Sequence, residues 1–335
     1  MKVLALVLAG GNGTRLYPLT ARHAKPALPL ANGYRIIDFV LSNLVNSGIG
    51  SIYVLAQYQP HSLVEHLAAA WAPHFNARDR FLKVILPKAH EGAGSFRGTA
   101  DAVYKNRHLI ERHRPELVGV FAADHVYRMD VRQMAAFHEE RGAEVSVAAI
   151  PVPLEKASSF GVMVTAADGR IEEFQEKPQQ PTPIATAPHL AYASMGNYLF
   201  GPDILGRLLE EAAANGWTDF GQHILPSLPG RCRIFAYDFS ENRIPGVAPY
   251  EERAYWRDVG TLEALAAARQ DVAGLRPRFN LYNRHWPILG GGYRKRPAVG
   301  EDDGLRGETG SGGAVPFPPL AEAAVEARSE RVAEG

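Results

Sequence analysis

The chain has 335 residues, of which 46% are hydrophobic and 21% charged, and its formal net charge is zero. This balance, with no long basic run, argues against a nucleic-acid partner or an acidic membrane surface, although a small anionic ligand needs only local charge. The single cysteine, Cys232, cannot form an intramolecular disulfide and is typical of a reducing cytoplasm. No segment approaches the roughly 20 apolar residues of a membrane span, and the apolar stretch at the N-terminus is too short for a signal peptide. We therefore expect a soluble cytoplasmic protein.

Strands and helices alternate in the first part of the chain. The apolar pattern predicts a strand at 3–8, a helix at 35–47, a strand at 51–57, helices at 61–71 and near 100–113, and a strand at 118–124. Alternation of this kind favours a parallel sheet with right-handed crossovers. Ligands of such sheets bind at the carboxyl ends of the strands, which is where Gln57 and Asp124 stand.

From about residue 145 the pattern changes to strands joined by short turns. We expect strands within 145–152, 160–178, 194–202 and 233–239, a hairpin turn at Asp168-Gly169, and helices at 203–214, 219–227 and from Thr261. This mixed half is expected to extend the same sheet. The pattern ends around residue 287, and the stretch that follows is rich in glycine, proline and charge, which predicts flexibility. A short helix is expected at 320–335.

The first predicted strand runs into a glycine-rich turn in LVLAGGNGTRL, with Gly10, Gly11 and Gly13 followed by Arg15. It is not a Walker A loop, because the lysine and the serine or threonine are missing at the required spacing. It is not a dinucleotide fingerprint either, because Leu16 stands where the third glycine belongs. What remains is a loop whose backbone amides approach an anion that Arg15 neutralises, with a plain tight turn as the alternative.

Four charged positions could complete such a site. Asp124 ends an apolar strand, where a carboxylate could hold Mg²⁺ bound to phosphates, although it could also cap a following helix. Asp258, in WRDVG, could be a second metal ligand or a helix cap. Lys25 and Lys177 could be cationic ligands or solvated surface residues. Glu176 and Lys177 are adjacent and are expected on different faces, so the sequence alone predicts no ion pair between them.

Other familiar catalytic patterns are missing from the sequence. His61, Glu65 and His66 lack the H-E-x-x-H spacing, so a zinc site has no support. No activating pattern surrounds Cys232, and no Ser–His–Asp set can be assigned.

Taken together, several motifs closely resemble the nucleotidyltransferase domain of bacterial glucose-1-phosphate adenylyltransferases, the ADP-glucose pyrophosphorylases. They are LAGGNGTRL, AKPALPL, RIIDFVLSNLVNSGI, AQYQPHSLVEHL, FRGTADAV, DHVYRMD, FGVM, FQEKP, SMGNYLF and WRDVGTLEA. The resemblance implies an α/β fold with a Rossmann-like mixed, mainly parallel sheet flanked by helices. It also implies a catalytic domain at 1–289, followed here by a glycine-rich tail at 290–335. Family members continue into a left-handed β-helix, and because the tail has no hexapeptide periodicity we expect no complete β-helix.

The resemblance further implies an enzyme that makes ADP-glucose and pyrophosphate from ATP and α-D-glucose 1-phosphate for glycogen or α-glucan synthesis, with Mg²⁺ as cofactor. A sugar-phosphate oxygen would attack the α-phosphorus of ATP, so no protein nucleophile is required. Such enzymes work as homo- or hetero-oligomers. Two alternatives stay open: a catalytically weak regulatory subunit of the same enzyme, and a glucose-1-phosphate nucleotidyltransferase that uses UTP or dTTP.

Site residues follow from the same resemblance, position by position. The residues implied are Arg15, Lys25 and Asp124 for catalysis; Gly10, Gly11, Gly13, Thr14, Gln57, Gly98 and Thr99 for the nucleotide; Gly161, Glu176, Lys177 and Ser194 for the sugar phosphate; and Asp124 and Asp258 for the metal. The chain departs from the family at Phe96, where many members have tyrosine. It also has Arg22 and His23 among the family's basic regulatory positions, and Gln222 and His223 where lysine and aspartate are common.

Overall fold

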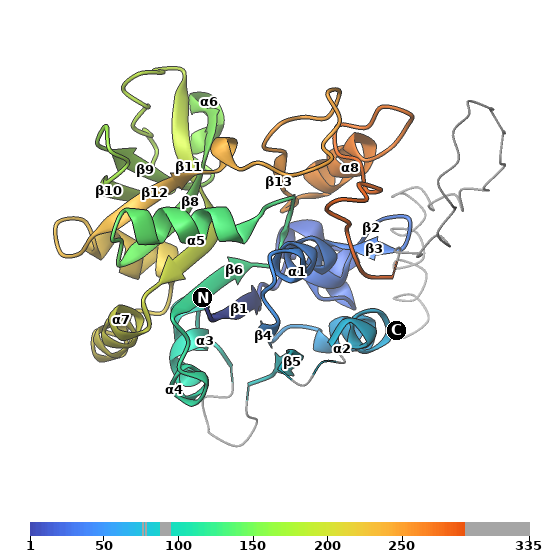
Figure 1. Cartoon of the computed structure of the whole chain (residues 1–335), viewed down its shortest axis with the longest axis horizontal. Coiled ribbons are helices and arrows are strands. Elements are labelled where there is room, and N and C mark those ends of the chain that lie inside the picture. Colours follow the sequence, from blue (N-terminus) through green and yellow to red (C-terminus); the bar gives the residue numbers. More distant parts are fainter. Residues whose placement is uncertain (76, 78, 88–94, 292–335) are drawn as a thin grey trace, which may run out of the picture.

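A computed structural model describes residues 1–75, 77, 79–87 and 95–291. The predicted flexibility of the tail and the short helix at 320–335 lie outside the described residues. At the centre of the described part is a nine-stranded sheet in the order β10-β9-β11-β6-β1-β4-β5, with β8 paired to β11 and β12 (Figure 1). These strands are β1 Val3–Ala9, β4 Ser51–Ala56, β5 Phe81–Ile85, β6 Leu117–Ala122, β8 Val145–Pro153, β9 Gly161–Thr165, β10 Ile171–Glu176, β11 Leu190–Phe200 and β12 Ile234–Asp238.

The sheet has two halves that meet where β6 pairs with β11. On one side β6, β1, β4 and β5 are all parallel. The alternation of strands and helices predicted β1, β4 and β6 in this arrangement, whereas β5 was not predicted. On the other side β11 is antiparallel to β6, β8 and β9, and β9 and β10 form the predicted hairpin. The expected mixed α/β sheet, extended by the second half of the chain, is therefore confirmed.

Helices cover both faces of the sheet because neighbouring side chains of each strand point to opposite sides. In β1, Leu4 and Leu6 belong to the core under the helices α3 (Thr99–Lys105), α4 (His108–His113) and α7 (Pro202–Ala214). Ala5 and Val7 belong to the core under α1 (Ile36–Asn46), α2 (Pro60–His66) and α5 (Val131–Glu140). Figure 1 shows α3, α4 and α7 gathered at one side of the sheet. The helices are α1 Ile36–Asn46, α2 Pro60–His66, α3 Thr99–Lys105, α4 His108–His113, α5 Val131–Glu140, α6 Leu154–Ala157, α7 Pro202–Ala214 and α8 Leu262–Asp271. No helix among the described residues is long and apolar enough to cross a membrane.

Some predicted elements differ from the observed ones at their ends. The helix expected near 100–113 is two helices, because the Asn106 side chain donates to the Ala102 carbonyl at 2.8 Å and ends α3 there. The helix expected at 61–71 is α2 followed by a π-helical turn, Leu67–Trp71. The helix expected at 219–227 is a π-helical turn, Phe220–Ile224, followed by a 3₁₀ turn.

A small antiparallel ribbon beside the sheet positions part of the site. Its strands are β7 His125–Tyr127 and β13 Trp256–Asp258, and together with α8 and the pair β2 Pro29–Ala31 and β3 Tyr34–Arg35 they enclose a separate apolar cluster. Figure 1 shows α8 beside β13. Asp124 is therefore followed by a strand, not by the helix that one of its alternatives required. Asp258 lies on β13, and Thr261 caps α8 by accepting a hydrogen bond from the Ala264 amide at 3.2 Å.

The segment after residue 285 is packed on α1. Its side chains Trp286, Ile288 and Leu289 are buried, and the Leu289 amide donates to Ser42 Oγ at 2.8 Å. These residues fall within the catalytic domain expected at 1–289, and they are buried through contacts with a helix far away in the sequence.

Candidate functional site

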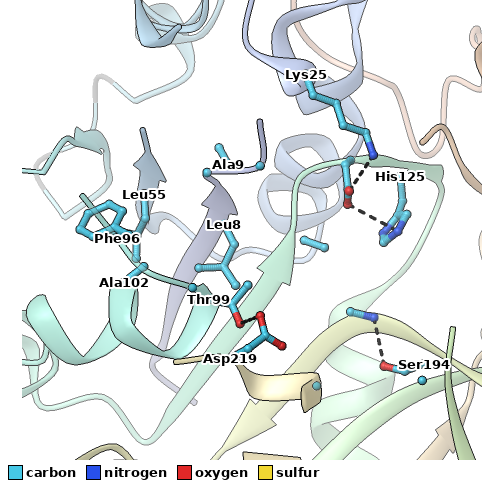
Figure 2. A pocket seen from close by; sticks show the side chains of 18 of the residues that line it. Leu8, Ala9, Lys25, Leu55, Phe96, Thr99, Ala102, His125, Ser194 and Asp219 are labelled. Carbon is cyan, nitrogen blue, oxygen red and sulfur yellow. Dashed lines mark hydrogen bonds and ion pairs between the residues drawn. The ribbon is translucent and has the colours of Figure 1, made fainter. Parts of the chain in front are cut away.

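A cavity of about 500 Å³ opens at the carboxyl ends of β1, β4 and β6 and continues over β9, β10 and β11 (Figure 2). Its wall contains ten of the residues expected at the site: Gly10, Gly11, Lys25, Gly98, Thr99, Asp124, Gly161, Glu176, Lys177 and Ser194. Five others lie around it without lining it: Gly13, Thr14, Arg15, Gln57 and Asp258. The structure thus brings together, from both halves of the sheet, residues that the sequence distributes over more than two hundred positions.

The strongest charges of the site converge in one cluster. Lys25 Nζ lies 2.8 Å from Asp124 Oδ2 and 3.6 Å from Asp258 Oδ1. His125 Nε2 lies 3.5 Å from Asp124 Oδ1, so that Lys25 and His125 approach the same carboxylate (Figure 2). The ribbon produces this arrangement, because Asp258 of β13 is paired with His125 of β7.

The Asp124 carboxylate is held in its anionic form. Desolvation works to raise its pKa, but the neighbouring His125 and Lys25 side chains, with a hydrogen bond from Lys25, outweigh this and hold the pKa far below the usual value of an aspartate. An anionic carboxylate that is available at every physiological pH is what binding of a cation requires.

Asp124, His125 and Asp258 form a set that could hold a divalent metal ion. One ligand atom from each lies within 4.8 Å of the others, and the two carboxylates supply the oxygen ligands that suit Mg²⁺ or Mn²⁺. Two observations support the fit. The position already accommodates the positive charge of Lys25, and the buried Nδ1 of His125 has no hydrogen-bond partner within the described part of the chain. His125 was missed in the sequence, although its place directly after Asp124 was a usable signal.

The glycine loop lies directly beside Lys25. Gly13 has φ +61°, and a Cβ there would lie 2.8 Å from Thr20 Cγ2 and 3.3 Å from Lys25 Cβ. Only glycine satisfies both the backbone conformation and this close approach. Arg15, in a 3₁₀ turn from Thr14 to Leu16, is exposed and reaches toward the ribbon, since a Cβ on Gly260 would lie 2.9 Å from its Nη2.

Gln57 does not line the cavity itself but holds a residue that does. Its Nε2 donates to the Phe96 carbonyl at 3.2 Å, and its Oε1 accepts from the Phe96 amide. Both polar ends of the side chain are thereby used to hold Phe96, which does line the cavity. Gln57 therefore holds Phe96 in place, and its expected contact with the nucleotide stays a prediction.

A second turn closes on the start of α3. The Thr218 carbonyl accepts hydrogen bonds from the amides of Ala100 and Asp101, and a Cβ on Gly98 would lie 2.4 Å from that oxygen. Thr99 Oγ1 donates to Asp219 Oδ2 at 2.8 Å, and Figure 2 shows both side chains at the cavity. Asp219 was missed in the sequence, because only the fold brings it to Thr99.

The other end of the cavity is built on β9, β10 and β11. Glu176 Oε2 lies close to two glycines, since a Cβ would be 3.1 Å away from it on Gly161 and 2.9 Å on Gly221. Lys177 Nζ forms an ion pair with Glu176 Oε1 at 3.2 Å, which corrects the expectation that the two side chains diverge. Alternation of faces holds for extended backbone, whereas Lys177 lies just beyond β10 and has φ +46°. Ser194 Oγ accepts from the Gly196 amide at 3.3 Å.

The sequence of the chain is similar to those of known nucleotide-using enzymes. The model of the nucleotidyl transferase family matches residues 4–274. The chain belongs to this family. A glucose-1-phosphate adenylyltransferase of Thermodesulfovibrio yellowstonii is 52% identical to this nucleotidyl transferase over 88% of the chain and 72% of the relative. Proteins of the same name from Thermus thermophilus and Frankia casuarinae are 45% and 46% identical, over 86% and 91% of the chain and 71% and 74% of the relatives. Nucleotidyl transferases generally use a divalent metal ion, and Asp124, His125 and Asp258 are the described residues that could hold it.

Proposed function

We propose that the chain is a glucose-1-phosphate adenylyltransferase, which transfers AMP from ATP to α-D-glucose 1-phosphate and releases pyrophosphate. The observation that carries the proposal is the arrangement of one cavity. It has an apolar end and a polar end, and the glycine loop and the Lys25–Asp124 ion pair lie between them. This geometry occurs in a chain that is 52% identical to a protein of that name. The product would serve glycogen or α-glucan synthesis, and residues 1–289 would form the catalytic domain.

The nucleotide fits the apolar end of the cavity. Leu8, Leu55, Phe96 and Ala102 lie together there and offer a surface for the adenine ring (Figure 2). From that position the triphosphate extends along the backbone amides of Gly10 and Gly11, with Lys25 beside them. Gly13 and Thr14 shape the loop, and Arg15 supplies a second cation for the leaving pyrophosphate.

The sugar phosphate fits the polar end. Lys177 is placed to bind its phosphate, while Glu176 and Ser194 can accept or donate hydrogen bonds to glucose hydroxyls. Gly161 and Gly221 allow the Glu176 carboxylate to lie against the backbone, since a Cβ would be 3.1 Å from its Oε2 on Gly161 and 2.9 Å on Gly221.

The reaction then needs positioning and charge neutralisation more than proton transfer. A phosphate oxygen of glucose 1-phosphate forms a bond to the α-phosphorus of ATP, and the bond from that phosphorus to the bridging oxygen of pyrophosphate breaks. Both reactants are anions, so Lys25, Lys177 and Arg15 lower their mutual repulsion. Asp124 and Asp258, with His125, would hold Mg²⁺, which supplies further charge neutralisation on the phosphates when bound.

Pyrophosphate release, measured with glucose 1-phosphate and each of the four common nucleoside triphosphates, tests the proposal. We expect ATP to give a kcat/KM at least about tenfold above the others, which is about 1.4 kcal/mol of transition-state discrimination. A preference for UTP or dTTP would support the nucleotidyltransferase that uses another base. No turnover with any nucleotide would support the regulatory-subunit alternative.

A further inference from the structure

The ammonium of Lys25 lies in the position where the two metal-binding carboxylates converge. It is 2.8 Å from Asp124 and 3.6 Å from Asp258, and the side chain is only 8% exposed. A buried ammonium of this kind depends on its counter-charges. We propose that Lys25 and the divalent metal ion are alternative occupants of the Asp124–Asp258 position, and that metal binding transfers the Lys25 ammonium to the phosphate loop. The inference rests on the proposed function in assigning a metal to these carboxylates.

Simultaneous occupation is electrostatically unfavourable. A divalent ion held by both carboxylates would lie in direct contact with the Lys25 ammonium. The two positive charges of the ion would then repel the single positive charge of the lysine. When Lys25 leaves, Asp124 would keep its other neighbour, because His125 Nε2 lies 3.5 Å from Asp124 Oδ1. Arg15 and Asp258 approach the same glycine, since a Cβ on Gly260 would lie 2.9 Å from Arg15 Nη2 and 3.1 Å from Asp258 Oδ1. The cluster therefore tolerates an exchange of one cation for another.

Lys25 can reach the loop without any movement of its backbone. Its Cβ would be 3.3 Å from a Cβ on Gly13, so the side chain starts next to the loop, and it lines the cavity together with Gly10 and Gly11. The backbone around it is fixed, since the Ala24 amide donates to Ser62 Oγ at 3.3 Å and the Leu28 amide donates to the Lys25 carbonyl at 3.1 Å. The flexible four-carbon stem of a lysine is sufficient for the exchange.

In this exchange Lys25 binds two different anionic partners in succession. In the free protein it neutralises two carboxylates that would otherwise repel each other in the half-buried cluster. With metal and nucleotide present, the same ammonium becomes a ligand of the triphosphate. A lysine that had to be recruited from solvent would first lose its side-chain entropy, whereas Lys25 is already ordered beside the loop.

Binding of Mn²⁺ in the absence of nucleotide tests the competition directly. Mn²⁺ suits carboxylate and imidazole ligands, and the free ion can be measured by electron paramagnetic resonance. If Lys25 occupies the position in nine of ten molecules, the apparent affinity of the wild type is reduced about tenfold, so Lys25→Met should bind Mn²⁺ at least about tenfold more tightly. Lys177→Met is the matched control, because Lys177 lines the same cavity but pairs with Glu176, and its Mn²⁺ affinity should equal that of the wild type. An affinity of Lys25→Met equal to or weaker than that of the wild type would overturn the proposal.

A second experiment uses the wild type, so it does not depend on the folding of a variant. Brief acetylation followed by mass spectrometry reports how accessible each lysine is, with Lys177 as the internal reference. We expect the labelling of Lys25 to rise at least about fivefold when Mn²⁺ saturates the protein, because its ammonium leaves a buried ion pair. Labelling that is unchanged or slower would contradict the exchange. Neither readout requires turnover, so an inactive protein or a different base preference would refute the proposed function and leave this result standing.

Discussion

Asp258 stands directly opposite His125 across the ribbon of β7 and β13, and this pairing brings two carboxylates and an imidazole to one point. Asp124 immediately precedes the ribbon and Asp258 ends it. The site thus depends on the register of two three-residue strands, because a slip by one residue would turn Asp258 to the opposite face.

Replacing Asp124 by asparagine should remove most activity and leave the fold nearly intact. The amide has the shape of the carboxylate without its charge, so it cannot hold a cation or pair with Lys25. We expect kcat for pyrophosphate release to fall by at least about a hundredfold, by analogy with the loss of one preorganised electrostatic group. Asp168→Asn, in the hairpin turn between β9 and β10, is the control and should match the wild type. Retention of more than about a tenth of the wild-type rate by Asp124→Asn would contradict the catalytic role.

Lys177→Ala should separate the two substrates kinetically. Lys177 lies at the end of the cavity proposed for the sugar phosphate, away from the glycine loop. We expect the KM for glucose 1-phosphate to rise at least about tenfold while the KM for ATP changes less than about twofold. Lys156→Ala, an exposed lysine on α6, serves as the control. Equal increases of both KM values would show that the assignment of this end of the cavity is wrong.

Gly98→Ala should disturb the contact between α3 and the 218–221 turn. The new Cβ would lie 2.4 Å from the Thr218 carbonyl oxygen, so that the turn carrying Asp219 must move. We expect a loss of about 1–3 kcal/mol in the free energy of unfolding and a higher KM for ATP. The matched control is Gly206→Ala inside α7, where a Cβ meets nothing within 4 Å. That change should be neutral or stabilise by up to about 1 kcal/mol, because alanine has the higher helix propensity. Denaturant unfolding of both variants measures the difference.

The stability of the fold should decrease in mild acid, partly through His138. Burial lowers the pKa of this histidine below its usual value, and its Nδ1 lies 2.9 Å from Ser146 Oγ. The unfolded chain therefore binds a proton near pH 6.5 that the folded chain refuses, so stability is complete above that pH and is lost as the pH falls toward the lower folded pKa. His138→Gln should reduce the slope of unfolding free energy against pH just below about pH 6.5 by up to about 1.4 kcal/mol per pH unit.

Three of the four parallel strands, β1, β4 and β6, were predictable because they are continuous apolar runs with helices between them. The fourth, β5, was not predicted, and its residues are half-buried apart from Lys83, which is exposed. The motifs likewise led to the cavity residues Gly10, Lys25 and Asp124 without a structure. Local pattern did not reveal that Asp124 precedes a second short strand, since three residues such as His125–Tyr127 carry too little periodicity to be recognised.

Several contacts in the site could not be read from the sequence because they join distant segments. Gln57 uses both ends of its side chain on Phe96, and Asp219 meets Thr99. The Glu176–Lys177 pair depends instead on one backbone angle, the positive φ of Lys177, which no apolar pattern encodes.

The junction between β6 and β11 has a consequence for how such a protein can change its specificity. One wall of the cavity, with Leu55 and Phe96, belongs to the parallel half, and the other, with Glu176 and Ser194, belongs to the antiparallel half. The two walls are joined by a continuous backbone ladder, because β6 pairs with β11 and neighbouring strands are spaced by about 4.8 Å. Under the proposed function, substitutions on the first wall would alter the accepted base and substitutions on the second would alter the accepted sugar, while the approach of the two phosphates would stay the same.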